Sequence, residues 1–348
     1  MSSLLPLPIV RDADKTAIVD VRGRTLRDLR ISLTDHCNLR CTYCMPAHLF
    51  GSDHRFLPID KLLNFEEIAT LVKVAAGLGL RKVKLTGGEP LLRPQLGRLV
   101  RMIREAAPSI EIALITNGIL LAPLAAELRE SGLDRVTVSL DSLRPERFAA
   151  MSGRGPQQDK VLAGIEAARR AGFHPIKLNM VVIRDVNDDE VVPMANFFRG
   201  TDTVLRFIEY MDVGTLNHWQ RSQVVGAAEI LEKLRRDADL EPITPDYRGE
   251  TAERYRYTDG SGEIGFIASV TQPFCSDCNR LRLSADGRIF GCLFSSEGFD
   301  LGRVLRTQGP AAAREALIRF WLHRQDQYSV ERNTQSAPDK IEMFYIGG

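Results

Sequence analysis

The stretch Cys37–Cys44, which reads CNLRCTYC, holds three of the six cysteines of this chain. The other three, Cys275, Cys278 and Cys292, form a second triplet near the C-terminus, so no cysteine is left over for packing or for a disulfide. An iron–sulfur cluster normally takes four cysteine ligands, and a triplet leaves one of its irons open. We therefore expect two clusters, with the chemistry of the protein at an open coordination site.

Structural zinc is the alternative for each triplet, but it takes four ligands. Beside the first triplet only His36 is near in sequence, and it directly precedes Cys37, in a geometry that usually cannot chelate. Beside the second triplet, Asp277 and Asn279 offer no convincing fourth ligand. The spacing favours clusters and leaves zinc open.

The composition excludes several classes of protein. The chain has 348 residues, of which 44% are hydrophobic and 26% charged, as in a soluble globular protein. Its 46 basic and 45 acidic residues give a net charge of +1, without the cationic field that drives binding to nucleic acids or anionic membranes. The apolar stretches are shorter than the roughly 18 to 20 residues of a membrane span, and no signal peptide is visible. We expect a cytoplasmic protein, whose closely spaced cysteines ligate metal.

Short apolar runs alternate with amphipathic stretches over residues 26–209, which is typical of parallel strands connected by helices. The strand candidates are residues 29–33, 82–85, 111–115, 135–140, 176–182 and 204–209. The helix candidates are residues 65–78, 96–107, 121–131, 160–171 and 188–198. The pattern predicts an α/β fold, either an incomplete barrel or an open sheet.

The rhythm changes after residue 211. One helix pattern covers residues 225–236, and β-like segments follow at 255–257, 264–268, 280–284 and 289–293. We interpret residues 1–25 as an N-terminal extension, 26–211 as the strand-and-helix domain, and 212–348 as a smaller C-terminal α+β module with a tail.

Several polar motifs follow or end the predicted strands. They are TDHC at residues 34–37, GGEP at 87–90, NG at 117–118 and SLDS at 139–142. In parallel sheets and barrels the carboxyl ends of the strands carry the active site. The sequence therefore predicts that these motifs meet at one end of the sheet.

The cysteine stretch at residues 37–44 resembles the signature of the radical S-adenosylmethionine enzymes, and the GGEP turn is similar to the second element of that family. The resemblance implies an incomplete (β/α)6 TIM-like barrel of the radical SAM type, with the C-terminal module closing its mouth. It also implies that a [4Fe-4S] cluster binds S-adenosylmethionine and cleaves it to methionine and a 5′-deoxyadenosyl radical. Only an incompletely ligated cluster can both bind and reduce a substrate.

Arg280 and Arg282 would share one face of a strand beside the second triplet. They are either solvated or a phosphate clamp, since guanidinium groups match phosphate oxygens. Together with the terminal Gly347 and Gly348, they make residues 30–348 resemble the branch of the family that acts on GTP in the first step of molybdenum cofactor biosynthesis.

This resemblance implies a role for each matching residue. The first [4Fe-4S] cluster would be held by Cys37, Cys41 and Cys44, and the auxiliary [4Fe-4S] cluster, which meets guanine, by Cys275, Cys278 and Cys292. The S-adenosylmethionine pocket would be lined by Tyr43, Gly88, Ser139 and Met211. GTP would be contacted by Arg30, Lys84, Lys177, Arg280, Leu281 through its backbone, and Arg282. The tail glycines Gly347 and Gly348 would reach the active site and take part in cyclisation.

Lys84 and Lys177 interrupt apolar strands. A lysine in such a strand usually points to solvent, but in a barrel it can face the substrate cavity, which the motifs favour. One position departs from the family pattern: the family commonly has threonine where this chain has Ile115, before Thr116. Ile115 cannot donate a side-chain hydrogen bond, so that substrate contact is in doubt.

The implied reaction abstracts a hydrogen atom from C3′ of GTP and bonds C3′ to C8. One further electron, with a proton, then reduces the resulting aminyl radical to give 3′,8-cyclo-7,8-dihydroguanosine 5′-triphosphate. The implied partners are an electron donor such as flavodoxin or ferredoxin, a downstream cyclic pyranopterin monophosphate synthase, and a second copy in a homodimer. Two alternatives stay open. One is a radical enzyme acting on a peptide or another small molecule, and the other is a zinc-stabilised binding protein.

Overall fold

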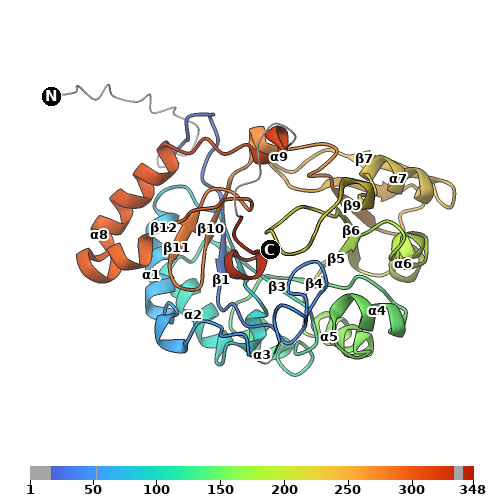
Figure 1. The fold of residues 1–348 in the computed structure, drawn as a ribbon, viewed down its shortest axis with the longest axis horizontal. Coiled ribbons are helices and arrows are strands. Elements are labelled where there is room, and N and C mark those ends of the chain that lie inside the picture. Colours follow the sequence, from blue (N-terminus) through green and yellow to red (C-terminus); the bar gives the residue numbers. More distant parts are fainter. Residues whose placement is uncertain (1–16, 52, 333–339) are drawn as a thin grey trace.

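The computed structural model describes residues 17–51, 53–332 and 340–348. Its centre is a curved sheet with helices packed around the outside (Figure 1). The sheet begins with parallel strands that run side by side in chain order. They are β1 (Asp28–Ser32), β2 (Lys82–Thr86), β3 (Glu111–Thr116), β4 (Arg135–Ser139), β5 (Ile176–Val182) and β6 (Thr203–Glu209). The predicted α/β partial barrel is confirmed, with each strand end within one residue of its prediction.

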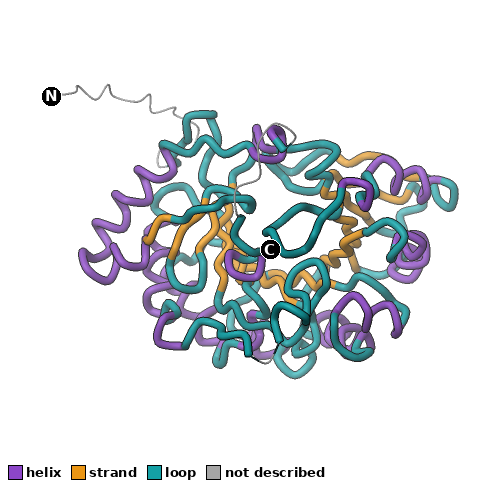
Figure 2. Tube along the Cα trace, in the orientation of Figure 1, coloured by secondary structure: helices purple, strands orange, loops and turns teal. Residues whose placement is uncertain are grey.

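Helices cover the outer face of these strands, as the tube in Figure 2 shows. They are α1 (Phe65–Ala76), α2 (Leu96–Ala106), α3 (Ala125–Glu130), α4 (Pro145–Ser152), α5 (Gln158–Arg170) and α6 (Val191–Phe198). Helix α1 starts at a capping box, in which Asn64 and Glu67 exchange side-chain and backbone hydrogen bonds. Helix α3 starts four residues later than predicted, because Gly118 has a φ of +79° and begins a series of turns. Helix α4, with a proline in its first turn, was not predicted.

The remaining elements come from the C-terminal part of the chain. The helices are α7 (Ala227–Arg235), α8 (Leu301–Leu322), α9 (Tyr328–Glu331) and α10 (Met343–Ile346). The strands are β7 (Leu240–Ile243), β8 (Glu253–Tyr257), β9 (Glu263–Ile267), β10 (Arg280–Leu283), β11 (Arg288–Phe290) and β12 (Phe299–Asp300). The sequence did not predict β7, which contains Pro242, or the two-residue β12.

The C-terminal strands continue the barrel sheet at both of its edges. Strand β10 pairs in parallel with β1, and β9 pairs in parallel with β6. Within the described ranges the result is one 12-stranded sheet, ordered β12-β11-β10-β1-β2-β3-β4-β5-β6-β9-β8-β7. An incomplete barrel leaves two unpaired strand edges, and this pairing covers them. The domain boundaries at residues 25 and 211 stay predictions.

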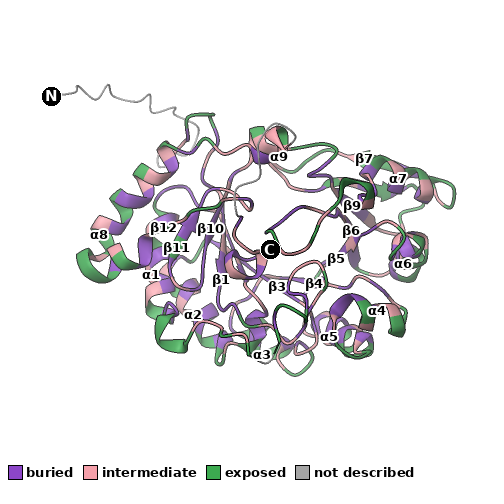
Figure 3. Ribbon diagram, in the orientation of Figure 1, coloured by how far each residue is buried: buried purple, intermediate pink, exposed green. Residues whose placement is uncertain are grey.

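The apolar core lies between the sheet and the outer helices, where Figure 3 shows buried residues along the strands and the facing sides of the helices. Alternate residues of a strand point to opposite faces. In β2, Val83 and Leu85 are fully buried in the core, whereas Lys82 and Lys84 line the inner cavity. The described helices include none with the length and apolarity needed to cross a membrane.

Candidate active site

The inner face of the sheet encloses a cavity of about 940 Å³ that both cysteine triplets line. The residues proposed from sequence that border it are Cys37, Cys41, Cys44, Cys275, Cys278, Cys292, Tyr43, Gly88, Ser139, Met211, Arg30, Lys84, Lys177, Arg280, Arg282 and Gly348. Two others do not border it. Leu281 is buried in the apolar core, so only its backbone is free to contact a ligand, and Gly347 lies beside Arg282.

The first triplet lies in a loop after β1 that Arg40 holds in shape. The guanidinium of Arg40 donates hydrogen bonds to the carbonyl oxygens of Cys37 at 2.7 Å, Leu39 at 2.8 Å and Phe50 at 2.7 Å. The Sγ of Cys37 accepts from the amide of Leu39 at 3.4 Å. Burial raises the pKa of Cys37 to about 11 and raises those of Cys41 and Cys44 further. Nearby positive charge does little to stabilise the thiolate forms of these cysteines. A bound metal would supply that positive charge.

The GGEP turn packs directly on the loop that precedes the cysteines. The amide of Gly88 donates to the carbonyl oxygen of Thr34 at 2.7 Å, and that of Glu89 to His36 at 2.7 Å. A Cβ at Gly88 would collide with the backbone of His36, so only glycine permits this approach. The buried carboxylate of Glu89 accepts from the Thr116 hydroxyl at 2.7 Å. The two motifs therefore form one unit.

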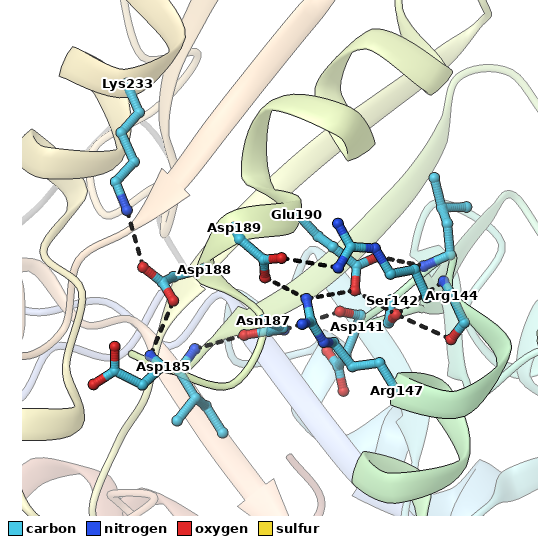
Figure 4. A network of polar contacts seen from close by, with 12 residues as sticks. Asp141, Ser142, Arg144, Arg147, Asp185, Asn187, Asp188, Asp189, Glu190 and Lys233 are labelled. Atoms are coloured by element: carbon cyan, nitrogen blue, oxygen red, sulfur yellow. Dashed lines mark hydrogen bonds and ion pairs between the residues drawn. The ribbon is translucent and has the colours of Figure 1, made fainter.

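Tyr43 connects this unit to the ends of β4 and β5. Its hydroxyl donates to Oδ2 of Asp141 at 2.6 Å, and Oδ1 of Asp141 accepts from the amide of Val181 at 2.8 Å. Behind Asp141, the side chain of Asn187 donates to the carbonyl oxygen of Asp141 at 2.9 Å (Figure 4). It also donates to the carbonyl oxygen of Val181 at 2.8 Å. These contacts fix the rim of the cavity on the side of the first triplet.

A buried carboxylate strengthens the same rim. Glu190 is 1% exposed and accepts from the Ser142 hydroxyl at 2.7 Å, the Leu143 amide at 3.0 Å and the Arg147 guanidinium at 3.0 Å (Figure 4). Asp189 pairs with Arg147 as well. The loops after β4 and β5 are thus joined by charge-assisted hydrogen bonds.

The second triplet has a cationic environment. Cys278 Sγ accepts from Arg280 Nη2 at 3.1 Å and from Arg324 Nη2 at 3.3 Å. Burial opposes ionisation, but the two guanidinium groups outweigh it and hold the pKa of Cys278 at about 6. Burial raises the pKa of Cys292 to about 12. At neutral pH the charged thiolate form of Cys278 is therefore favoured before any metal binds.

The number and kind of ligands at each triplet bear on the choice between zinc and a cluster. Among the residues that the structure describes, no three cysteine, histidine, aspartate or glutamate side chains are grouped to hold a single metal ion. A zinc ion needs its ligands to converge at about 2.0–2.3 Å, whereas in a [4Fe-4S] cubane each cysteine binds a different iron. Three soft ligands facing one cavity suit the cubane.

The inner face of the strands is strongly cationic. Lys84 is paired with Asp28 at 2.7 Å, and burial lowers its pKa to about 7 despite that carboxylate. Burial lowers the pKa of Lys177 to about 8, and repulsion from the positive charge of Arg206 acts in the same direction. Arg206 itself lines the cavity and was missed from the sequence, although it interrupts an apolar strand just as Lys84 does. A polyanion would compensate these charges.

The position that departs from the family pattern also faces the cavity. Ile115 lines it, whereas the hydroxyl of Thr116 donates to Glu89. Thr116 therefore does not replace the missing threonine as a donor to substrate in this structure.

The tail of the chain reaches the cavity. The carbonyl oxygen of Gly347 contacts the guanidinium of Arg282, and Thr86 donates to the carbonyl oxygen of Gly348 at 3.5 Å. The approach is anchored by the Tyr345 hydroxyl, which donates to Asp286 at 2.6 Å. The tail glycines thus lie against a guanidinium that also borders the cavity.

Residues 31–198 match the family described as Radical SAM superfamily, and residues 203–330 match Molybdenum Cofactor Synthesis C. The partial barrel and its incomplete set of cysteine ligands therefore define a radical S-adenosylmethionine enzyme. Among curated proteins, the chain is 48% identical to the GTP 3′,8-cyclase of Acidothermus cellulolyticus, over 95% of this chain and 99% of the relative. It is 46% identical to that of Xanthomonas campestris pv. campestris, over 97% and 99%. The chain belongs to the GTP 3′,8-cyclase family.

Solved structures with a similar chain trace include anSMEcpe with bound AdoMet and methylornithine synthase. For the first the TM-score is 0.49 at 21% identity, covering 61% of this chain and 57% of that one. For the second it is 0.46 at 18% identity, covering 61% and 62%.

Proposed function

We propose that the protein converts GTP to 3′,8-cyclo-7,8-dihydroguanosine 5′-triphosphate, the first step of molybdenum cofactor biosynthesis. In this reaction S-adenosylmethionine is cleaved, and methionine and 5′-deoxyadenosine are released. The observation that carries the proposal is a single cavity lined by two cysteine triplets and, between them, by inward-facing cations of the strands. Family membership supports S-adenosylmethionine and iron–sulfur clusters as cofactors.

The first cluster would be held by Cys37, Cys41 and Cys44, and together with S-adenosylmethionine it would supply a radical that abstracts a hydrogen atom from the substrate. The protein's own residues provide the setting. Gly88 lets the GGEP turn pack closely on the backbone of the loop before the cysteines, and Tyr43, fixed by Asp141, borders the same cavity. The walls of the cavity would limit the access of water to the reacting carbon atoms.

GTP would lie between the triplets, with its base toward the cluster of Cys275, Cys278 and Cys292. Arg30, Lys84 and Lys177 line the cavity and would neutralise the triphosphate. Arg280 and Arg282 extend from the second triplet along β10. Gly347 and Gly348 would complete the site next to Arg282.

The partners beyond the substrate are part of the proposal. We infer an electron donor such as flavodoxin or ferredoxin, transfer of the product to cyclic pyranopterin monophosphate synthase, a homodimer, and a cytoplasmic location. The near-neutral net charge of +1 gives no support for a nucleic-acid partner.

Anaerobic incubation of the reconstituted protein with dithionite, S-adenosylmethionine and GTP tests the activity. We expect 5′-deoxyadenosine in equal amount to cyclised nucleotide, measured by chromatography and mass spectrometry, and neither product when GTP is replaced by inorganic triphosphate. Deoxyadenosine formation with intact GTP would instead favour action on a peptide or another small molecule. Zinc in place of iron after anaerobic purification would contradict the proposal altogether.

A further inference from the structure

The three cysteines of the second triplet lie on separate backbone segments with little regular structure. Cys275 begins a three-residue 3-10 turn, Cys278 ends it, and Cys292 follows β11 in a different loop. A cluster needs these segments at a fixed spacing. The contacts that fix it come from residues that neither the motifs nor the proposed reaction includes.

One side of the arrangement comes from a turn near the N-terminus. Asp20 accepts from the amide of Arg24 at 2.9 Å and from its Nε at 2.6 Å. Nη1 of Arg24 then donates to the carbonyl oxygen of Cys275 at 3.0 Å and to that of Asp326 at 2.7 Å. The side chains of Asp20 and Arg24 are 0% and 1% exposed. A buried ion pair therefore holds the backbone of Cys275.

The other side comes from the residues after α8. Arg324 Nη1 donates to the carbonyl oxygen of Cys278 at 2.7 Å, and its Nε to that of Gly291 at 3.0 Å. Its Nη2 also donates to Cys278 Sγ at 3.3 Å. One guanidinium thus joins the segment of Cys278 to the residue that precedes Cys292.

The two sides meet at Asp20. Nη1 of Arg324 lies 3.6 Å from Oδ2 of Asp20, the oxygen that Arg24 Nε contacts, and the Arg324 side chain is only 2% exposed. The indole of Trp321 donates to the carbonyl oxygen of Arg24 at 3.0 Å and lies under the guanidinium of Arg324. Removing one member of a buried ion network leaves the other charges unpaired, so the loss of any member should destabilise this region.

We propose that Asp20, Arg24 and Arg324 form a clamp that positions the C-terminal iron–sulfur cluster. They hold the backbone at Cys275, Cys278 and Gly291 at the spacing the cluster requires. Arg324 has a second effect, because a cationic donor to Cys278 Sγ raises the reduction potential of a cluster bound there. These are positioning residues, since they act through the cysteine segments. The proposal rests on the assignment of the second triplet made above.

Arg324→Met in the full-length, anaerobically reconstituted protein is the test. We expect about half of the iron and sulfide to be lost, with the half that remains belonging to the first triplet. That cluster is identified by the change in its electron paramagnetic resonance spectrum when S-adenosylmethionine is added. Arg24→Met should give the same selective loss, because it releases the segment of Cys275.

Two further variants separate positioning from general stability. Arg22 is exposed in the same turn as Arg24, and its Nε donates to the carbonyl oxygen of Gln325 at 3.0 Å rather than to a cysteine segment. Arg22→Met is therefore the matched control, and it should keep full iron content. Arg324→Lys keeps the charge but cannot reach three acceptors at once. It should retain part of the second cluster, with a lower midpoint potential in a redox titration than the wild-type cluster.

The possible results divide clearly. Full iron content in Arg324→Met with an unchanged midpoint potential would overturn the clamp, as would equal loss of both clusters in Arg324→Met and Arg324→Lys. Cys275→Ala serves as the reference for an absent second cluster. If it keeps full iron content, the assignment of the triplet is wrong. If it loses half of the iron while Arg324→Met does not, only the clamp is wrong.

Discussion

The two cysteine triplets provide the same ligand set in opposite surroundings. The first lies within one loop, closed by Arg40 through backbone carbonyl oxygens. Its half-buried cysteines have raised thiol pKa values that no nearby cation offsets. The second is assembled from separate segments, and two guanidinium groups donate to Cys278 Sγ. Positive charge and hydrogen bonds at the sulfurs stabilise the reduced form of a cluster. The first site is therefore suited to a strong reductant, and the second to binding an electron-rich or anionic ligand.

The largest predicted effects follow from removing one cysteine ligand of each triplet, and they test most directly whether the two sites have different roles. Cys37→Ala should abolish 5′-deoxyadenosine formation, because the cluster that cleaves S-adenosylmethionine loses a ligand. Cys275→Ala should retain slow cleavage without cyclised product, because only the substrate side is affected. Chromatographic assay of both products distinguishes them. Cyclisation of GTP by Cys275→Ala would show that the two sites are not specialised in this way.

A smaller effect is expected at Arg282, which lies along β10 from the second triplet. Arg282→Met should weaken GTP binding on the order of 10- to 100-fold, as expected for a lost charge-assisted hydrogen bond. Affinity for S-adenosylmethionine should stay within about twofold, because Arg282 is assigned to the other ligand. Calorimetry with each ligand separately measures both. Equal loss of the two affinities would mean that Arg282 maintains the whole cavity.

The cationic wall between the triplets should give binding a pH dependence. Burial lowers the pKa of Lys177 to about 8, so its positive charge is present below that pH and lost above it. GTP affinity should therefore fall several-fold between about pH 7 and 9, since each lost charge weakens phosphate binding. Lys177→Arg, whose guanidinium stays protonated, should reduce that decrease to the part caused by Lys84, whose pKa burial lowers to about 7. A decrease of the same size in Lys177→Arg would assign it to another group.

The smallest effect concerns the rim beside the first triplet. Tyr43→Phe removes the hydroxyl that donates to Asp141, and it should weaken S-adenosylmethionine binding about threefold to tenfold, because a buried hydrogen bond to a charged acceptor is lost. GTP affinity should not change. A variant with both affinities unchanged would show that the loop of the first triplet is held in place without this contact.

The sequence was sufficient to predict the parts that depend on local pattern. Alternation places Val83 and Leu85 on one face and Lys84 on the other, and the structure has this arrangement. The close spacing of Cys37, Cys41 and Cys44 likewise places all three in one loop after β1, where they line the cavity. The roles assigned to individual residues at the cavity stay proposals.

The rest depends on contacts between distant parts of the chain. Nothing near Asp20 or Arg324 in the sequence indicates that they meet, because more than 300 positions separate them, and a buried Asp–Arg pair has no periodic signature. Pairing of β10 with β1 was missed for the same reason. Arg206 could have been predicted as a cavity residue, because it interrupts an apolar strand in the same alternating pattern as Lys84 and Lys177.

The way the sheet is completed has a consequence for the biogenesis of the protein. The strands that cover the outer edges of β1 and β6 are β10 and β9, and both are encoded after residue 262. A chain emerging from the ribosome therefore exposes two open strand edges until most of it has been made. Unpaired edges attract other strands and favour aggregation. The first cysteine loop is synthesised long before those edges are covered. Insertion of iron during translation would therefore take place on an unfinished barrel, and a gene split after residue 211 would yield two fragments that fold poorly apart.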